Sequence, residues 1–290
     1  MMIRFITEIM QTHRIFVIGA AAAFIGMGSA AYGYVLEGAH ILDMYVKNQG
    51  KAGNVAVRQR LKTHESTHSL ELFQILTYKH PDKYRMEISE GGREWVYARS
   101  NGRSVTVIDG KLSDVEESIF ERYPDLLIGR SRSALQQHLL ELGVDVSISS
   151  LGRFNGSVVY VIGARYPDES RPQIWFDKEA FLPVRWLAPD RGGARKPACK
   201  EIVFLDWREV NGIRYPMHMK FNINAVNVRE IIVDAVNRDV TIPDDQFDIG
   251  MIRAAHPRTR GEHLIEIDSG KPSESAEPRS LIENFERMYR

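Results

Sequence analysis

The chain has 290 residues, of which 43% are hydrophobic, and this is enough for a real core and excludes an intrinsically disordered protein. Its 38 basic and 38 acidic residues cancel, so no global field favours nucleic acid or an anionic membrane as a partner. The single cysteine, Cys199, excludes an intrachain disulfide and a thiolate metal site.

The N-terminal segment is typical of a secretory signal peptide. An apolar run of 13 residues spans positions 15–27, and the small residues Ser29 and Ala31 follow it. The run is short for a membrane span of about 20 residues, but it fits a secretory apolar region. We expect residues 1–31 to be cleaved after Ala31, with a retained single anchor as the alternative. No cysteine follows the apolar run, so the mature protein is not itself a lipoprotein.

A helix and a strand are expected next. Residues 35–47 place apolar side chains near one side of a helix, which Gly50 and Gly53 end, and this helix should lie on the sheet. The following strand has one apolar face, formed by Val55, Val57, Gln59 and Leu61. Its other face is strongly basic and carries Arg58, Arg60 and Lys62. We interpret this basic row as solvated surface; contact with an anionic headgroup is the alternative.

Residues 70–78 and 84–88 predict a β-hairpin. Pro81 has no amide hydrogen, so strand pairing stops there and a turn with Asp82 follows. The string Tyr-Lys-His-Pro-x-x-Tyr-Arg at 78–85 is similar to the Lys-Arg-Pro-x-x-Phe-Arg signature of the periplasmic lipoprotein-carrier (LolA-like) family. Further strands are predicted at 94–99 and 104–110, with Asn-Gly and Asp-Gly turns.

A helical insertion at 113–143 interrupts the strands. Ser133 and Gln136 have capping-box spacing, and Leu135, Leu139 and Leu142 then repeat on one helical face. This apolar stripe needs a partner surface, and the sheet is the only large one available.

The second half predicts strands again, without intervening helices. They are expected at 144–151, 157–166, 173–176, 182–186, 201–210, 215–223 and 228–236. Many strands at regular spacing, without intervening helices, indicate an antiparallel barrel or half-barrel rather than a parallel sheet.

Two later hairpins extend the family resemblance. The string Trp-Phe-Asp-Lys-x-x-x-Leu-Pro-Val-Arg at 175–185 resembles the family's Trp-x-Asp-x-x-x-x-x-Pro hairpin. Residues 205–216 resemble its Asp-Tyr-x-x-Val-Asn-Gly-x-x-x-Pro hairpin. The resemblance covers about residues 36–249. It implies an unclosed, strongly curved antiparallel β-barrel under a helical lid, a periplasmic location, and an inner-membrane exporter and an outer-membrane receptor as partners of a monomer.

Two features depart from the family pattern: the insertion is long, and the chain continues after residue 249. We therefore expect a signal peptide at 1–31, the half-barrel domain at 32–249 and a tail at 250–290. This tail should be a linker followed by a short helix with Leu281, Phe285 and Met288 on one face. Docking through this helix, or a frayed end, are the two interpretations.

One string has a catalytic pattern. His64-Glu65-Ser66-Thr67-His68 matches H-E-x-x-H, which holds zinc only when both histidines lie on one helical face. Strands flank this string, and His80 and His138 offer no third-ligand spacing, so a polar hairpin loop is favoured over a zinc hydrolase. No G-x-S-x-G, Walker or dinucleotide fingerprint occurs. We expect no catalytic residue, metal or cofactor.

The predicted strands are unusually rich in apolar residues. Ordinary core is one interpretation; the other is a lipid-binding cavity beneath the insertion. The expected lipid-binding residues are Trp95, Tyr97, Leu135, Leu139, Trp175, Trp186, Phe204, Met217, Met219 and Phe221. The resemblance and this apolar content together predict a non-enzymatic carrier of a lipid or an acylated lipoprotein. A periplasmic sensor or assembly domain of the same fold is the alternative.

Overall fold

The computed structural model describes residues 35–50, 53–64, 69–90, 93–114, 119–128, 131–189 and 198–258. Several predicted features lie outside these residues: the signal peptide at 1–31, positions 65–68 of the H-E-x-x-H string, and the helix of the C-terminal tail.

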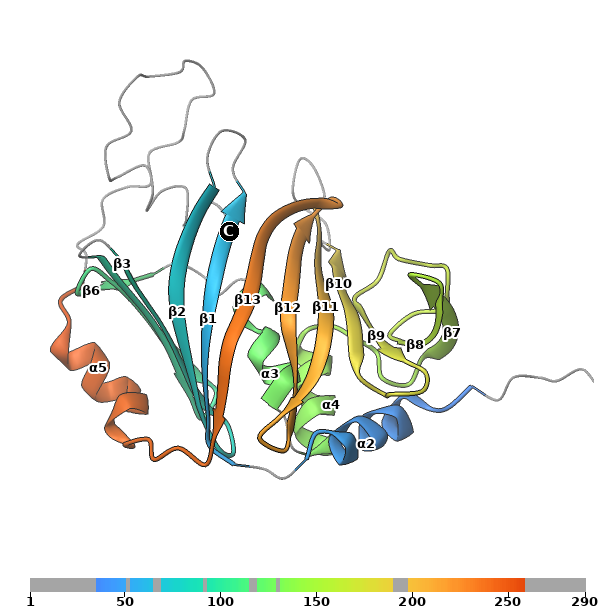
Figure 1. Ribbon diagram of the computed structural model, residues 1–290, viewed down its shortest axis with the longest axis horizontal. Coiled ribbons are helices and arrows are strands. Elements are labelled where there is room, and N and C mark those ends of the chain that lie inside the picture. The colour runs from blue at the N-terminus through green and yellow to red at the C-terminus, as the bar shows by residue number, and fades with distance from the viewer. Residues whose placement is uncertain are drawn as a thin grey trace, which may run out of the picture. The chain divides into compact units, whose positions relative to one another are not determined.

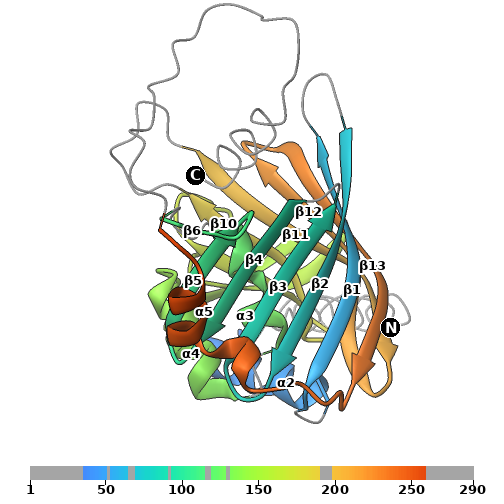
Figure 2. The same cartoon turned by 90° about the vertical axis from the view of Figure 1, so that its left-hand side faces the viewer.

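The described strands form one antiparallel sheet in the order β6-β5-β4-β3-β2-β1-β13-β12-β11-β10-β9-β8-β7. The sheet curves strongly (Figures 1 and 2), but β6 and β7 do not pair, so it stays open. This confirms the predicted unclosed half-barrel. The strands are β1 Val55–His64, β2 Ser69–Lys79, β3 Lys83–Glu90, β4 Arg93–Ser100, β5 Arg103–Ile108, β6 Lys111–Ser113, β7 Ser149–Phe154, β8 Ser157–Ile162, β9 Gln173–Asp177, β10 Pro183–Pro189, β11 Cys199–Val210, β12 Ile213–Ile223 and β13 Val226–Arg238.

Tight turns set the register of several neighbouring strands. Asn101, Asn155 and Asn211 have φ of 51°, 48° and 53°, and a glycine with positive φ follows each. Positive φ at both central residues is the hairpin geometry that Asn-Gly favours, because it matches the twist of the strands. The long-range pairing of β1 with β13, with Val57 opposite Val236, joins the two halves of the sheet.

Three helices contribute buried side chains to the core on the concave side of the sheet. They are α2 (Gly38–Asn48), α3 (Tyr123–Ile128) and α4 (Arg132–Glu141), with the short 3₁₀ turn η1 (Ile119–Glu121) before α3. Figure 1 shows α3 and α4 within the curve of the strands. We call η1, α3 and α4 the lid. The lid belongs to one insertion between β6 and β7, the two edge strands.

The start of α4 differs from the sequence prediction. Ser131, not Ser133, caps the helix: its Oγ accepts a hydrogen bond from the Ala134 amide at 3.1 Å, and Ser133 lies inside the helix. The apolar stripe itself is as predicted, because Leu135 and Leu139 are both buried.

The opposite face of the sheet carries another helix, α5 (Ile249–Ala255). Its Ile249 and Ile252 pack on Ala98, Val105 and Val107 of β4 and β5. Figure 2 shows α5 on the side of these strands away from α3 and α4. The packed chain therefore continues past residue 249, where we predicted a linker. No helix in the described part of the chain is long and apolar enough to cross a membrane.

Candidate functional site

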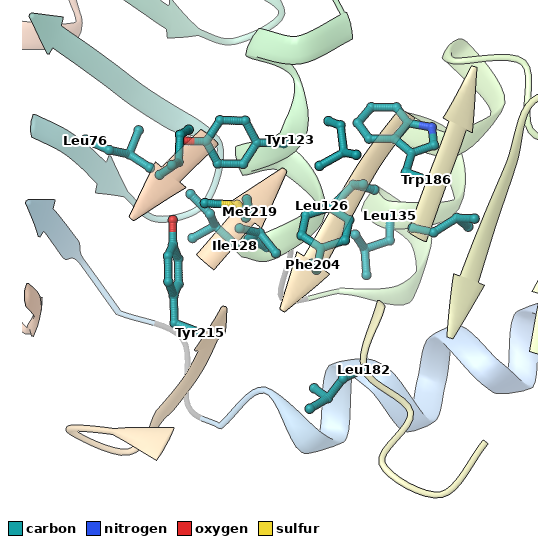
Figure 3. Close-up of a cluster of buried hydrophobic side chains, with 14 of the residues drawn as sticks. Leu76, Tyr123, Leu126, Ile128, Leu135, Leu182, Trp186, Phe204, Tyr215 and Met219 are labelled. Carbon is teal, nitrogen blue, oxygen red and sulfur yellow. The ribbon is translucent and has the colours of Figure 1, made fainter. Parts of the chain in front are cut away.

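The candidate site is the apolar cluster between the concave face and the helices. Strand residues enter it at alternate positions, because successive side chains of a strand point to opposite faces. On β3, Tyr84, Met86 and Ile88 are buried in this cluster. Leu126, Leu135 and Leu139 of the lid belong to the same cluster. Figure 3 shows part of the cluster, with Leu126 and Leu135 of the lid and Phe204 and Trp186 of the sheet labelled.

Most of the expected lipid-binding residues lie together in this cluster. The buried ones are Tyr97, Leu135, Leu139, Trp186, Phe204, Met219 and Phe221. Trp95 and Met217 are partly buried and pack against it. Lid and sheet side chains thus cover one another, so a guest molecule could enter only by replacing contacts that the lid makes.

Trp175 is the exception. It packs edge-on against Phe154 at a ring distance of 5.7 Å, and the Arg185 guanidinium lies 4.5 Å from its ring centre. These residues belong to a separate buried cluster, while the strand neighbours Ile174 and Phe176 join the main one. Strand β9 is buried on both faces, so its sequence is continuously apolar. Without an alternation of polar and apolar residues, the sequence does not show to which face Trp175 belongs. The prediction that placed Trp175 with the other site residues is therefore wrong.

Buried hydrogen bonds attach the lid to the rest of the cluster. Tyr45 of α2 donates to the Leu126 carbonyl at 2.7 Å, and Tyr84 donates to the Glu121 carbonyl at 3.1 Å. Gln59 Nε2 donates to the Tyr123 hydroxyl at 2.8 Å. Burial raises the pKa of Tyr123 to about 12, although the bond from Gln59 opposes this shift. In all three contacts the donor lies outside the lid and the acceptor lies in it.

Two further donors face the cluster. Trp186 Nε1 and the Tyr215 hydroxyl are buried and make no hydrogen bond with any part of the chain that the structure describes. Burial raises the pKa of Tyr215 well above its ordinary value, so this hydroxyl keeps its proton. Both residues are visible in Figure 3.

A buried ion pair joins the lid to β13. Arg229 Nη1 lies 3.3 Å from Glu121 Oε1, and Arg229 Nη2 donates to the Phe120 carbonyl at 3.3 Å. The guanidinium also lies over the Phe221 ring, 4.0 Å from its centre. Neither residue of this pair was predicted to belong to the site. A signal was present, because Arg229 shares the alternation of the apolar residues Ile231 and Val233.

A second ionic cluster attaches the outer part of the lid. Arg99 of β4 pairs with Asp125 of α3 at 2.7 Å, and Arg122 donates to His138 Nδ1 at 2.9 Å. Burial lowers the pKa of His138 to about 3, and the positive charges of Arg122 and Arg99 add to this shift. Asp125 Oδ2 lies 3.3 Å from the ring, but it is shared with both arginines. The imidazole is therefore neutral at physiological pH.

Two residues of the basic row on the outer face of β1 are paired with acids. Arg60 lies 3.0 Å from both Glu71 and Asp234, and Lys62 lies 3.3 Å from Glu71. Paired surface charges agree with our interpretation of this row as solvated surface rather than as a headgroup contact.

His64, the first residue of the H-E-x-x-H string, is the last residue of β1 and pairs with Ser69 across the sheet. A zinc site of this type needs that histidine in a helix, so the structure removes its geometric basis. Within the described ranges, no group of three or more His, Cys, Asp or Glu residues is placed to hold a metal ion.

Comparison with known proteins supports the fold. No protein-family model matches the chain, and no curated protein matches its sequence. Among solved structures, it is similar to a DUF1329 family protein from Desulfovibrio piger, with 13% identity, a TM-score of 0.51, and 74% of this chain and 97% of that chain covered. An outer-membrane lipoprotein-sorting protein domain from Vibrio parahaemolyticus matches with 12% identity, a TM-score of 0.51 and the same coverage. The chain has a LolA-like fold.

Proposed function

We propose that this protein is a non-enzymatic periplasmic carrier that holds a lipid, or the acyl chains of a lipoprotein, between the concave face and the lid. The observation that carries this proposal is the continuous apolar cluster formed by an open sheet and separate helices. The similarity in fold between this chain and a lipoprotein-sorting domain supports the same function.

The topology allows the lid to move without damage to the sheet. The whole lid belongs to the insertion between β6 and β7, and these are the two edge strands. Displacing it breaks side-chain contacts and a few hydrogen bonds, but no pairing between strands. The sheet can therefore stay folded while its concave face accepts a guest.

The energies of lid and guest are comparable. Four lid leucines, Leu126, Leu127, Leu135 and Leu139, are buried in the cluster. Exposing a leucine costs roughly 1.5–3 kcal/mol, so the four together cost roughly 6–12 kcal/mol. An acyl chain of about sixteen carbons gains on the order of 10 kcal/mol on leaving water, before ordering costs. The net affinity is then modest, which suits a carrier that must release its load.

Tryptophan quenching by a dibrominated stearate tests this function. Bromine quenches an indole only at close range. Two of the four tryptophans lie on neighbouring strands but on opposite faces of the sheet. Trp186 of β10 lies in the main cluster, whereas Trp175 of β9 lies in the separate one. Two variants are made in which phenylalanine replaces three of the four tryptophans, leaving either Trp186 or Trp175.

We expect saturable quenching of the variant that keeps Trp186 and little quenching of the matched variant that keeps Trp175. Circular dichroism of both variants checks that the sheet is intact. Equal quenching of the two would show that the fatty acid binds nonspecifically. No quenching of either, with intact folds, would refute the carrier function.

The proposal includes export of the mature chain. Residues 1–31 would act as a cleaved signal peptide, and the exporter and receptor of an outer-membrane route would be its partners. Mass spectrometry of the protein isolated from its native periplasm gives both the N-terminus, expected at Tyr32, and the identity of any lipid that copurifies.

A further inference from the structure

We propose that Arg229 is the binding residue for an anionic headgroup, and that Glu121 occupies the place of this headgroup while the lid is closed. The inference rests on the proposed carrier function and narrows its ligand to an amphiphile that joins a carboxylate or a phosphate to acyl chains. A neutral lipid would bind poorly.

The surroundings of Arg229 are apolar. Its guanidinium lies 4.0 Å from the centre of the Phe221 ring and 5.9 Å from that of the Phe120 ring, and the two rings pack against each other. The side chains of Arg229 and Glu121 are only 6% and 4% exposed. A charge held away from water is costly unless it is paired, so Arg229 needs a negative partner at this position in every state in which it stays buried.

The contacts that join Arg229 to η1 are long. Its bonds to Glu121 Oε1 and to the Phe120 carbonyl are each 3.3 Å. Charge-assisted bonds between a guanidinium and a carboxylate or phosphate are shorter, about 2.7–2.9 Å, and often use both nitrogens at once. A free headgroup can take the bidentate position, whereas Glu121 is fixed by the backbone of η1.

Opening the lid separates the two charges. Glu121 and Phe120 belong to η1, whereas Arg229 and Phe221 belong to β13 and β12. A displaced lid therefore takes Glu121 away from the guanidinium, which stays on the concave face. An acyl chain alone restores the apolar contacts but not the charge, and only a ligand with an anionic group restores both.

Tyr84 supports the same position of the headgroup. Its hydroxyl donates to the Glu121 carbonyl in the closed state and loses this acceptor when η1 leaves. An oxygen-rich headgroup at Arg229 would supply a new acceptor. The polar end of the ligand would then lie near β3 and β13, with its chains toward Leu135 and Leu139.

Two fluorescent probes test the inference: a stearate labelled far from its carboxylate, and the methyl ester of the same molecule. Both are titrated into the full chain at a pH where the free acid is ionised. We expect the wild type to bind the acid at least about 10-fold more tightly than the ester, which is the size of effect given by one desolvated charge pair. Glu121→Gln should bind the acid more tightly still, because the internal competitor is gone.

The double variant Arg229→Gln/Glu121→Gln removes both charges, so no unpaired charge is buried and the fold is preserved. It should bind acid and ester equally, and it should bind the ester more tightly than the wild type does, because opening the lid no longer separates two charges. The matched control is Arg185→Gln, because Arg185 also pairs with carboxylates and lies over an aromatic ring, but in the separate cluster. This control should keep the preference for the acid.

The outcomes separate the inference from the proposed function. Equal binding of acid and ester by the wild type, or a preference for the acid that survives in the double variant, refutes the role of Arg229 but leaves the carrier function intact. Binding of neither probe refutes both. In a competition experiment, dodecyl phosphate should displace the acid probe and inorganic phosphate should not. If inorganic phosphate, which has no acyl chain, displaced the probe, Arg229 would be a simple anion site and the inference would be overturned.

Discussion

The buried His138 makes the attachment of the lid sensitive to acid. Arg122 can only donate a hydrogen bond, so His138 Nδ1 must accept it and the neutral ring carries its proton on Nε2. Protonation of Nδ1 would break this bond and place a third positive charge beside Arg122 and Arg99. The pKa of His138 is lowered from 6.5 to about 3 by burial first and by these two charges second.

The sign of the pH effect follows from this depressed pKa. Below pH 6.5 the histidine of the unfolded chain takes up a proton, whereas that of the folded chain stays neutral until pH falls to about 3. The unfolded state then binds more protons, so the stability contribution is fully present above pH 6.5 and is lost as pH falls toward 3. The loss relative to neutral pH is about 2 kcal/mol at pH 5 and about 3 kcal/mol at pH 4.

The variant His138→Asn tests this magnitude, because the Asn oxygen can accept the bond from Arg122 but does not titrate. Urea unfolding of wild type and variant at pH 7 and pH 5 gives the change in the free energy of unfolding for each. The carboxylates common to both chains cancel in the comparison, and the variant should lose about 2 kcal/mol less than the wild type.

The control is His40→Asn, at an exposed position of α2, which should keep the wild-type pH dependence. Identical pH dependence in His138→Asn and wild type would refute the reasoning, because the imidazole would then be titrating normally in the folded chain. Native-state hydrogen exchange adds a spatial readout. The amides of α4 should lose protection at pH 5 before those of β12 do.

Two further substitutions have matched controls within the chain. Leu139→Ala should lower the free energy of unfolding, measured in urea, by about 2–5 kcal/mol, because Leu139 is fully buried. Leu140→Ala on the same helix should change it by less than about 0.5 kcal/mol, because Leu140 is 67% exposed. Similar losses in the two variants would mean that α4 does not pack as described. Gly163→Ala should destabilise well beyond the roughly 1–2 kcal/mol expected of Gly156→Ala. Both glycines have positive φ, but only at Gly163 would a Cβ overlap the Pro172 carbonyl oxygen, so equal costs would exclude that close approach.

The parts of the fold that the sequence predicted are those with local causes. Asn211-Gly212 specifies its hairpin turn because only the two residues at the turn need positive φ. The leucine spacing of α4 predicts a buried face because the helical period alone brings Leu135 and Leu139 together. The pairing of β1 with β13 has no such local cause. It joins segments more than 160 residues apart, so no turn sequence between the two strands predicts the pairing.

The site was only partly predictable for a related reason. Met219 and Phe221, both expected in the site, lie on one face of β12 because they alternate with polar neighbours, whereas β9 is buried on both faces, so its sequence does not show which face Trp175 occupies. Glu121 lies at the end of a polar, acidic stretch that resembles solvated surface. Its burial depends on Arg229, which is 108 residues away, and neither residue alone predicts the pair.

The direction of the hydrogen bonds at the concave face bears on what the face can hold. Tyr45, Tyr84 and Arg229 all donate to backbone carbonyls of the lid, and Trp186 and Tyr215 present further buried donors. Acyl chains joined by ester or amide bonds carry carbonyl acceptors, and a phosphate or carboxylate adds more. A ligand of this kind can replace the lid carbonyls one for one, whereas a plain hydrocarbon would leave the donors unsatisfied in an apolar site. The donors of this face therefore favour acylated, oxygen-bearing ligands, independently of the charge on Arg229.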